Sequence, residues 1–579
     1  MDRTGRIVVF LCVLAMFALF IFYPAPSPKL PPPVAVAPES SAQTLTATNN
    51  SPTTIQPVTP TPVPSPPVPI VEQLTFLEND ELRVTFTSHG AAIKAVELLK
   101  HKEGKNGNIM LNEQSHENVM DLSGWPGADT VSFQVKEGLP GSVVYSGDLP
   151  NGVKWERAYV LGKDYALQVK DSLTNTGATE VTLPAYGLSV GRAEPLLVAG
   201  HYQPVSNMYL GSGWLAQKFH LTTVSDFNPG FIPIIGTKTH NEKEMFSSKD
   251  VDAAPLKWLG VENQFFTVLL TPSADRLIQH ADFHCFNPRD SYGSVPSTVE
   301  PDIEASAFFP EVKVPAGQTI ALNYGIYAGP KDYDHLNALG AEQGELMNYG
   351  MFVFLIVPML KILHFWYSIL GSYGVAIILL TLMIKAITWP LQSIANRSGK
   401  RMQALAPKLK ELQAKHKDQP EKLNTETFAM YREYGVNPFG GCLPALVQMP
   451  VFFSLYYMLI NAVELRGQSF LWVHDLTQPD TVYTLPIMLF GQHLALNPLP
   501  IMVTGLTMVM MRMTPQIGDP QQAKIAQWMP LVFLFIFYNF AAALSLYYVI
   551  NNCVSIVQIY RNLRKPLPEL KRIPKKKAA

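Results

Sequence analysis

Hydrophobic positions divide the chain into two parts with different periods. Between about residues 71 and 335, apolar and polar residues alternate in short runs that turn-forming residues separate. Leu82, Val84 and Phe86 form one such run, and Asn151-Gly152 is one such turn. Because successive side chains of a strand point to opposite faces, a period of two predicts strands with one buried face. We therefore expect an all-β sandwich domain over residues 71–335.

Beyond residue 345 the apolar runs become long enough to cross a bilayer, which takes about 20 mostly apolar residues in a helix. We expect membrane spans at 371–392, 437–460, 498–514, 528–543 and 544–560. Lys and Arg are concentrated in the segments 393–436 and 561–579. Because positively charged loops stay in the cytoplasm, these two segments are predicted to lie inside.

The apolar stretch 345–370 is predicted to behave differently from the spans. It is interrupted by Pro358, Lys361 and His364. A full span there would reverse the orientation of everything after it. We therefore expect an interfacial amphipathic helix that lies on the outer membrane face.

The first 70 residues are predicted to anchor and tether the β-sandwich. Residues 1–23 place two arginines before an apolar run, which is typical of an uncleaved transmembrane anchor with a cytoplasmic N-terminus. Residues 24–70 are rich in Pro, Ser, Thr and Ala. Such a segment cannot bury enough apolar surface to fold, so we expect an extended tether.

A basic helical hairpin is predicted at residues 395–435, in the cytoplasm. Met402, Leu405, Leu409 and Leu412 are spaced three, four and three, which gives a heptad-like apolar seam. Lysines cover its other faces. These charges fit either a solvated surface or docking to an acidic partner such as ribosomal RNA.

The first core span carries a polar stripe around a lysine. Thr381, Lys385, Thr388 and Gln392 are spaced four, three and four, so they share one helix face. A charge inside a span costs about 2.5–3.5 kcal/mol at the bilayer centre and marks a candidate functional site. Lys385 could simply extend its amine to the cytoplasmic headgroups. We favour a wet cavity inside the bundle, because Thr381 carries the stripe deeper than that explanation requires.

A second polar stripe occupies the last span. Tyr548, Asn551, Ser555 and Gln558 are spaced three, four and three. Hydrogen bonding between helices would explain a single stripe of this kind. Two stripes together with the amide of Gln448 in the 437–460 span favour a shared hydrophilic site.

Composition excludes several kinds of chemistry. The four cysteines are widely separated, which argues against a disulfide framework. CxxC, HExxH and P-loop patterns are missing. We therefore expect no metal, no cofactor and no enzymatic activity. The formal net charge of -1 does not identify a partner.

Two other functions compete with a role built on the polar stripes. A secondary transporter or small-solute channel should show inverted repeats and acidic residues at mid-membrane. The sequence has no evident repeat and no Asp or Glu in the core spans. A membrane-anchored carbohydrate-active enzyme would use β-domain aromatics such as Trp125, Trp214 and Trp258, for which core packing is the alternative. That function leaves the helical part unexplained.

Three tracts resemble a known family. They are YGVAIILLTLMIKAITWPL, NPFGGCLPALVQMPVFFSLYYML and LSLYYVINN, and they are similar to the YidC family of membrane protein insertases. The preceding anchor, tether and β-domain resemble its Gram-negative type. The resemblance implies a multi-domain membrane protein: an all-α polytopic bundle, made of the anchor and a five-helix insertase core over 371–560, with a large periplasmic β-supersandwich. It also implies a multi-pass inner-membrane location, with both termini and the tail 561–579 in the cytoplasm.

The resemblance also assigns roles to particular residues. Lys385 stands at the position of the groove cation, with Thr381 one turn away and Tyr548 facing it. The expected groove residues are Lys385, Thr381, Thr388, Gln448, Tyr548, Asn551 and Ser555, and the expected substrate slide on the third span is Cys442, Met449 and Phe453. The sequence departs from the family in having Lys where Arg is usual, in the turn Asn539-Phe540-Ala541-Ala542, and in an extra segment at 490–500.

The implied partners are those of an insertase. They are nascent membrane proteins, the ribosome, the Sec translocon, the signal recognition particle receptor and the phospholipid bilayer, without DNA. Nascent transmembrane segments would enter the hydrophilic groove and leave into the inner membrane, with or without the Sec translocon.

Overall fold

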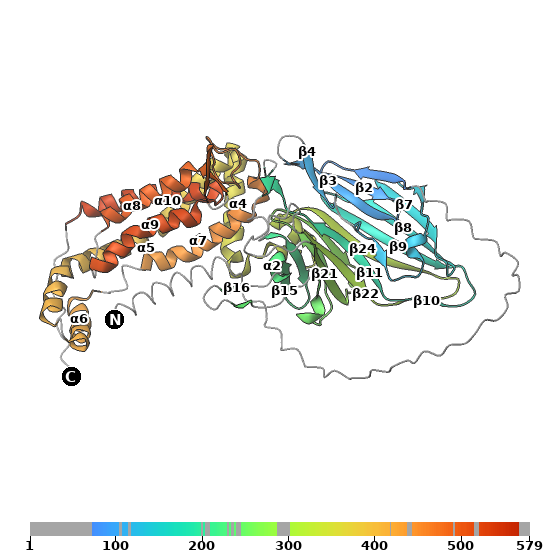
Figure 1. Cartoon of the computed structure of the whole chain (residues 1–579), viewed down its shortest axis with the longest axis horizontal. Coiled ribbons are helices and arrows are strands. Elements are labelled where there is room, and N and C mark those ends of the chain that lie inside the picture. The colour runs from blue at the N-terminus through green and yellow to red at the C-terminus, as the bar shows by residue number, and fades with distance from the viewer. Residues whose placement is uncertain are drawn as a thin grey trace, which may run out of the picture.

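A β-domain and a helical bundle lie end to end in the computed structural model (Figure 1). The structure describes residues 72–103, 107–113, 117–198, 201–202, 209–227, 231–232, 237–238, 245–286, 302–416, 419–436, 443–489, 492–514 and 520–566. The predicted anchor 1–23, the tether 24–70 and the tail beyond residue 566 lie outside the described residues. The two parts match the predicted division into a strand-rich and a helix-rich region.

The β-domain is built on antiparallel sheets of nine, five and four described strands. In spatial order, the nine-stranded sheet contains β15 (Phe219–Thr223), β14 (Gly211–Leu215), β19 (Trp258–Glu262), β20 (Phe266–Pro272), β24 (Thr319–Pro330), β9 (Ala166–Asn175), β8 (Val153–Leu161), β7 (Ser142–Asp148) and β6 (Gln134–Glu137). The five-stranded sheet contains β18 (Met245–Ser247), β21 (His280–Phe286), β22 (Asp302–Phe309), β11 (Tyr186–Ala193) and β5 (Leu122–Ser123). The four-stranded sheet contains β1 (Leu74–Glu78), β2 (Leu82–Thr87), β3 (Ala92–Glu103) and β4 (Gly107–Leu111).

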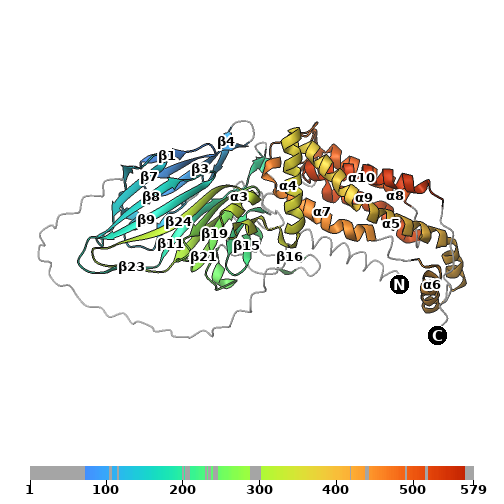
Figure 2. The same ribbon diagram turned by 180° about the vertical axis from the view of Figure 1, so that it is seen from behind.

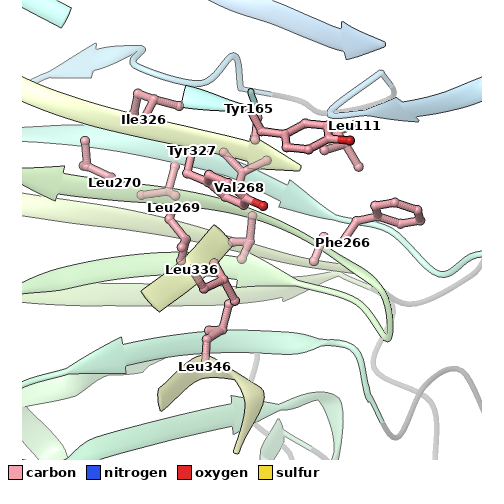
Figure 3. Packing of buried hydrophobic residues seen from close by; sticks show 14 of the residues in the cluster. Leu111, Tyr165, Phe266, Val268, Leu269, Leu270, Ile326, Tyr327, Leu336 and Leu346 are labelled. Atoms are coloured by element: carbon pink, nitrogen blue, oxygen red, sulfur yellow. The ribbon is translucent and has the colours of Figure 1, made fainter. Parts of the chain in front are cut away.

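Smaller elements complete the domain. Paired short strands are β10 (Val181–Leu183) with β23 (Val312–Val314), β12 (Leu197–Val198) with β13 (His201–Tyr202), and β16 (Phe231–Ile232) with β17 (Thr237–Lys238). The short helices are η1 (Ala128–Thr130), α2 (Val224–Phe227), η3 (Ser248–Asp250), α3 (Tyr333–Ala338), η4 (Gln343–Met347) and η5 (Gly350–Phe352). Figure 3 shows Leu336 of α3 and Leu346 of η4 pointing toward the strands, where both are buried in the core.

The alternation read from the sequence produces the buried faces of the strands. Along β8 the buried residues include Val153, Trp155, Arg157 and Tyr159, while the residues between them are half-buried. Such alternation places one face of a sheet in the core. The tryptophans Trp125, Trp214 and Trp258 are also buried in this core, with exposed fractions of 4%, 0% and 0%. They therefore pack inside the domain, as the core interpretation expects.

A buried ion pair lies at the centre of the β-domain. On β8 the Arg157 side chain is fully buried, and its Nε and Nη2 donate to the two carboxylate oxygens of Asp171 at 2.7 and 2.9 Å. The indole N–H of Trp155 donates to Asp171 Oδ1 at 3.0 Å. Arg157 Nη1 donates to the carbonyl of Met120 at 2.7 Å. The pair thus ties neighbouring strands of the nine-stranded sheet to the loop that follows the four-stranded sheet.

Seven longer helices follow the β-domain within the residues that the structure describes. They are α4 (Val353–Leu370), α5 (Tyr373–Lys415), α6 (Pro420–Tyr434), α7 (Leu443–Asn461), α8 (Pro498–Met513), α9 (Pro520–Phe537) and α10 (Ala542–Leu563). Three described helical segments are long and apolar enough to cross a membrane, namely Gly350–Leu370, Tyr373–Pro390 and Ala542–Leu563, and Pro498–Met513 is a shorter apolar helix. The predicted first span and the first helix of the predicted hairpin are one continuous 43-residue helix, α5.

Helix α4 has a different direction from its neighbours. Figure 2 shows α4 running across the end of the bundle that faces the β-domain, whereas α5, α7 and α10 run along the bundle. Its length and apolar composition would suit a span. Its crosswise direction suits the interfacial position that the sequence predicts, and this position remains a prediction.

The β-domain contacts the bundle directly as well as through the chain. Gln264 Nε2 donates to the carbonyl of Ile460 at the end of α7, at 2.9 Å. From the segment after α7, Arg466 Nη1 donates to the carbonyl of Lys102 at 3.2 Å, and its guanidinium carbon lies 5.5 Å from the ring centre of Phe266. The β-domain is therefore seated on the same end of the bundle that α4 crosses.

Candidate functional site

The lysine of the first predicted stripe is buried between α5 and α10. Lys385 is 8% exposed, and its Nζ donates to Ser555 Oγ of α10 at 2.9 Å. Ser555 in turn donates its hydroxyl hydrogen to the carbonyl of Asn551 at 2.8 Å. In the described part of the chain, Lys385 forms no ion pair with a carboxylate. A single hydroxyl acceptor leaves the other ammonium hydrogens free for a further partner.

The threonines of the stripe bond to their own helix. Thr381 is 1% exposed, and its hydroxyl donates to the carbonyl of Ile377 at 2.7 Å. The hydroxyl of Thr388 donates to the carbonyl of Ile384 at 2.9 Å. Such bonds to the preceding turn satisfy a hydroxyl in an apolar environment. The structure thus puts Thr381 beside Lys385 on the buried face of α5, with Thr388 half-buried one turn further on.

Helix α10 supplies the other side of the polar cluster. We use this name for Thr381, Lys385, Gln448, Tyr547, Asn551 and Ser555. Asn551 is buried, and its side-chain oxygen has no hydrogen-bond partner among the described residues. About two turns further along α10, the same holds for the side-chain oxygen of the buried Gln558. Buried acceptors without donors are uncommon in folded proteins and mark sites that another molecule can complete.

The expected groove residue was Tyr548, but the tyrosine that bonds to Gln448 in the structure is its neighbour Tyr547. Gln448 Nε2 of α7 donates to the hydroxyl of Tyr547 at 2.7 Å. Tyr548 instead lies among aromatic rings, 5.8 Å from Phe452 and 5.7 Å from Phe537 between ring centres. Residues 547 and 548 are four and three positions before Asn551, and both spacings fall on one helix face. The sequence pattern therefore could not choose between them.

The three expected slide residues of α7 have different environments. Met449 is 39% exposed, so its side chain is open to the surroundings of the bundle. Phe453 is 8% exposed and stacks on Phe352 of η5, with ring centres 6.0 Å apart. Cys442 lies outside the described residues. Met449 is thus the expected slide residue whose side chain the structure leaves accessible.

The starts of α8 and α10 are capped by residues of the segment between α7 and α8. The backbone N–H groups of Ala542 and Ala543, at the start of α10, donate to the carbonyls of Gln478 and Leu476 at 2.7 and 2.9 Å. The first N–H groups of a helix have no partner within it, so these carbonyls satisfy donors that would otherwise be open. At the start of α8, the N–H of Leu499 donates to Asp480 Oδ2 at 2.7 Å.

Two of the three departures from the family pattern, the turn 539–542 and the extra segment 490–500, belong to this capped end. The turn Asn539-Phe540-Ala541-Ala542 ends at Ala542, whose N–H makes the hydrogen bond to Gln478 just described. The extra segment supplies β26 (Gln492–Leu496), which forms a hairpin with the preceding strand β25 (Tyr483–Leu489). Asn497 joins this hairpin to the turn, because its side-chain nitrogen donates to the carbonyl of Tyr538 at 2.8 Å. The hairpin and the turn therefore form one connected unit.

Sequence reasoning missed several polar residues that the structure joins. Asn552 Nδ2 of α10 donates to Thr507 Oγ1 of α8 at 2.9 Å. Asn552 is adjacent to Asn551, whose side-chain nitrogen donates to Asn552 Oδ1 at 3.4 Å. A pair of adjacent polar residues in a span is the signal that could have predicted such polar contacts. The capping carbonyls of Leu476 and Gln478 belong to the main chain and left no such signal.

Comparisons with known proteins cover nearly the whole chain. The family model of the 60Kd inner membrane protein matches residues 365–566, and that of the YidC periplasmic domain matches residues 75–362. A membrane protein insertase YidC of Geobacter sulfurreducens is 32% identical over 581 residues, covering 97% of this chain and 98% of the relative. One from Syntrophus aciditrophicus is 38% identical over 308 residues, covering 53% and 52%. A crystal structure of an active YidC insertase matches with 17% identity and a TM-score of 0.32, over 84% of this chain and 92% of that one.

Proposed function

The chain belongs to the YidC family of membrane protein insertases, and from this premise we propose how its helical bundle passes transmembrane segments of newly made proteins into the inner membrane. The observation that carries the proposal is the buried Lys385. Its amine is buried inside the bundle and reaches only a hydroxyl among the described residues. Burying an ammonium group in that position costs free energy, so its presence there indicates a functional role.

The polar cluster would lower the barrier for the flank of a substrate. Unsatisfied polar groups cost several kcal/mol each in lipid. Lys385 offers donors, while the side-chain oxygens of Asn551 and Gln558 offer acceptors. A polar flank halfway across the membrane would thus exchange hydrogen bonds with the cluster. Burial of about 20 apolar residues of the entering span is downhill, so the step needs no fuel.

The remaining cluster residues would hold this arrangement in place. The hydrogen bond from Gln448 to Tyr547 connects α7 to α10, and the one from Lys385 to Ser555 connects α5 to α10. Thr381 and Thr388 would line the path along α5. Met449, on α7, would contact the apolar part of the substrate, as a flexible side chain that adapts to many sequences.

The relatives' function separates this proposal from its rivals. Relatives that match along the whole chain are named insertases, and this supports insertion rather than solute transport. The β-domain aromatics that a sugar-active enzyme would use are buried in the core. The proposal therefore assigns the chain no covalent chemistry and no cofactor.

The β-domain and the α5–α6 hairpin would lie on opposite sides of the membrane. Figure 1 shows α6 at the end of the bundle remote from the β-domain. With the β-domain in the periplasm, the basic hairpin is cytoplasmic, as are both termini, in agreement with the positive-inside rule. The hairpin is then available to the ribosome or the signal recognition particle receptor. The Sec translocon would approach the bundle within the bilayer of a Gram-negative cell.

Crosslinking tests the proposed substrate path. A photoreactive amino acid at Met449 is expected to crosslink to a stalled nascent membrane protein in intact inner-membrane vesicles, because the side chain is accessible there. The matched control is Leu139, which is 80% exposed in the β-domain. Capture at both positions, or at neither, would contradict a path along α7.

Cysteine labelling tests the orientation. With Cys12, Cys285, Cys442 and Cys553 replaced, Asn151→Cys in the β-domain and Glu411→Cys in α5 both offer exposed positions. A membrane-impermeant maleimide is expected to label position 151 in cells with a permeabilised outer membrane, and position 411 only after the inner membrane is opened. Labelling of position 411 with the inner membrane intact would reverse the orientation.

A further inference from the structure

A tight turn projects from the capped end of the bundle. The N–H of Phe470 donates to the carbonyl of Val473, and the N–H of Val473 donates to the carbonyl of Phe470, both at 2.9 Å. Leu471 and Trp472 are therefore the two residues at the tip. Leu471 has a φ of +54°, in the left-handed region. Glycine or asparagine adopts that conformation more easily than leucine does.

The turn is fixed to the bundle at its base. The ring of Phe470 lies against Gly374 in the first turn of α5, where an alanine Cβ would be 2.1 Å from Phe470 Cγ. The indole N–H of Trp472 donates to Asp480 Oδ2 at 3.1 Å. The same oxygen accepts the N–H of Leu499 at the start of α8. These contacts hold the tip in one position relative to α5 and α8.

The tip presents apolar surface away from the protein. The Leu471 side chain is 75% exposed, and Trp472 is 38% exposed although its N–H is bonded. A strained backbone that exposes a large apolar side chain gains nothing from contacts within the described part of the chain. The contacts at the base of the turn can hold the strained backbone in place, but they do not explain why a large apolar side chain stands at the exposed tip.

The surroundings of the tip identify what contacts it. Tyr373, next to Gly374, stacks on Tyr367 of α4 with ring centres 3.8 Å apart, so the tip lies near the corner where α4 ends and α5 enters the bundle. The end of α4 also exposes Ile369 and Leu370. Across the capped end, the β25–β26 hairpin exposes Val482, Tyr483 and Leu496.

We propose that Leu471 and Trp472 form a wedge that inserts into the headgroup–acyl boundary of the outer leaflet, beside the start of α5. Tryptophan is enriched at this depth of the membrane. The tip Phe470–Val473 carries no charge that would oppose entry. Its base at Phe470 packs on the start of α5, next to the corner where the apolar end of α4 is exposed. Two side chains are also far less than the about 800 Å² per partner that a stable protein interface buries, so lipid is the fitting occupant.

Depth-dependent fluorescence quenching tests this contact in the full-length protein. In a variant without native cysteines, an environment-sensitive dye is attached at Leu471→Cys, or at Ser469→Cys so that Leu471 is kept. The protein is reconstituted in lipid nanodiscs with phosphatidylcholine that carries a doxyl quencher near the headgroup or near the chain end. We expect a blue-shifted emission and several times more quenching by the shallow quencher than at the control, Asn151→Cys in the β-domain.

A second substitution separates lipid contact from local packing. With the dye at position 469, Leu471→Asp should reduce the quenching by the shallow quencher toward that of the control. Leu471→Gly should reduce this quenching as well. It should not lower the melting temperature of the protein, because glycine relieves the left-handed backbone. Emission and quenching at positions 469 and 471 equal to those at 151 would overturn the proposal. Self-quenching between labelled molecules that replaces lipid quenching would overturn it in favour of a second copy.

Discussion

Replacing Lys385 by glutamate is expected to abolish insertion of a small single-span substrate, whereas Lys385→Arg should retain it. The hydroxyl of Ser555 uses its hydrogen on the carbonyl of Asn551, so it presents an acceptor to residue 385. Arginine can donate to that acceptor and keeps the positive charge. Glutamate faces an acceptor at 8% exposure, and a buried carboxylate without a donor is strongly unfavourable.

Uncharged substitutions separate the charge from the hydrogen bond. Lys385→Gln can still donate to Ser555 Oγ, and Lys385→Leu can neither donate nor attract. If Lys385 attracts acidic flanks, both substitutions should reduce the insertion of substrates with acidic translocated flanks more than that of substrates with neutral flanks. Opposite charges about 6 Å apart attract by about 3 kcal/mol at an effective dielectric constant of about 20. With solvent screening, we expect a loss of roughly tenfold to a hundredfold for acidic flanks.

The measurement is insertion in cells depleted of the wild-type protein, with the flank charge of the substrate varied. Lys385→Gln and Lys385→Leu, inserted into the membrane at equal amounts, form the matched pair, because they differ in the hydrogen bond and share the loss of charge. Equal insertion by the lysine, glutamine and glutamate proteins for every flank would show that the charge has no role in capture. The polar cluster would then be a structural contact between α5 and α10.

The division into a β-domain and a helical membrane part was predictable because each follows from a hydrophobic period. On β8 the period of two places Val153, Trp155 and Tyr159 in the core. The long apolar runs predicted helices for a similarly simple reason, since a bilayer leaves no other partner for the backbone. Both signals depend on many side chains at once and tolerate single exceptions.

The end of the helix that contains the first core span was not predictable from polarity. Charges after residue 392 indicate where the chain leaves the membrane, but they do not end a helix. Helix α5 continues through Pro390 and Pro407 to Lys415. Its apolar seam at Met402 and Leu405 is buried against Tyr434, the last residue of α6, and Val436 just after it, which gives the extension a packing partner.

The candidate site was predictable as a set of helix faces, but its pairings were not. Lys385 and Ser555 each lie on a predicted stripe, and the structure joins them. Tyr547 and Tyr548 could not be distinguished by spacing, because only packing against α7 decides which ring meets Gln448. The carbonyls that cap α10 come from the main chain of Leu476 and Gln478, and any residue type would supply them.

Removing the carboxylate of Asp171 is expected to destabilise the β-domain by about 3–5 kcal/mol, because it leaves a buried charge without its partner. Arg157 is fully buried and always charged, and two of its nitrogens and the indole of Trp155 donate to Asp171. In Asp171→Ala these three donors lose their carboxylate acceptor, and only Arg157 Nη1 keeps its bonds to main-chain carbonyls. A loss of this size is a large part of the about 5–15 kcal/mol that keeps a typical domain folded.

The free energy of unfolding of the β-domain can be followed by denaturant titration of the purified full-length protein. The matched control is Glu78→Ala, which removes an ion-pair partner of Arg83. The Glu78 and Arg83 side chains are 40% and 45% exposed, so losing this pair should lower the free energy of unfolding by less than about 1 kcal/mol. The double variant Arg157→Met/Asp171→Leu leaves no buried charge, so it should be more stable than Asp171→Ala although it has lost more polar contacts. If Asp171→Ala is no more destabilising than Glu78→Ala, the ion pair does not hold the sheets together. If the double variant instead loses the summed cost of both single variants, the hydrogen bonds themselves stabilise the domain, and the stranded charge is not the cause of the loss.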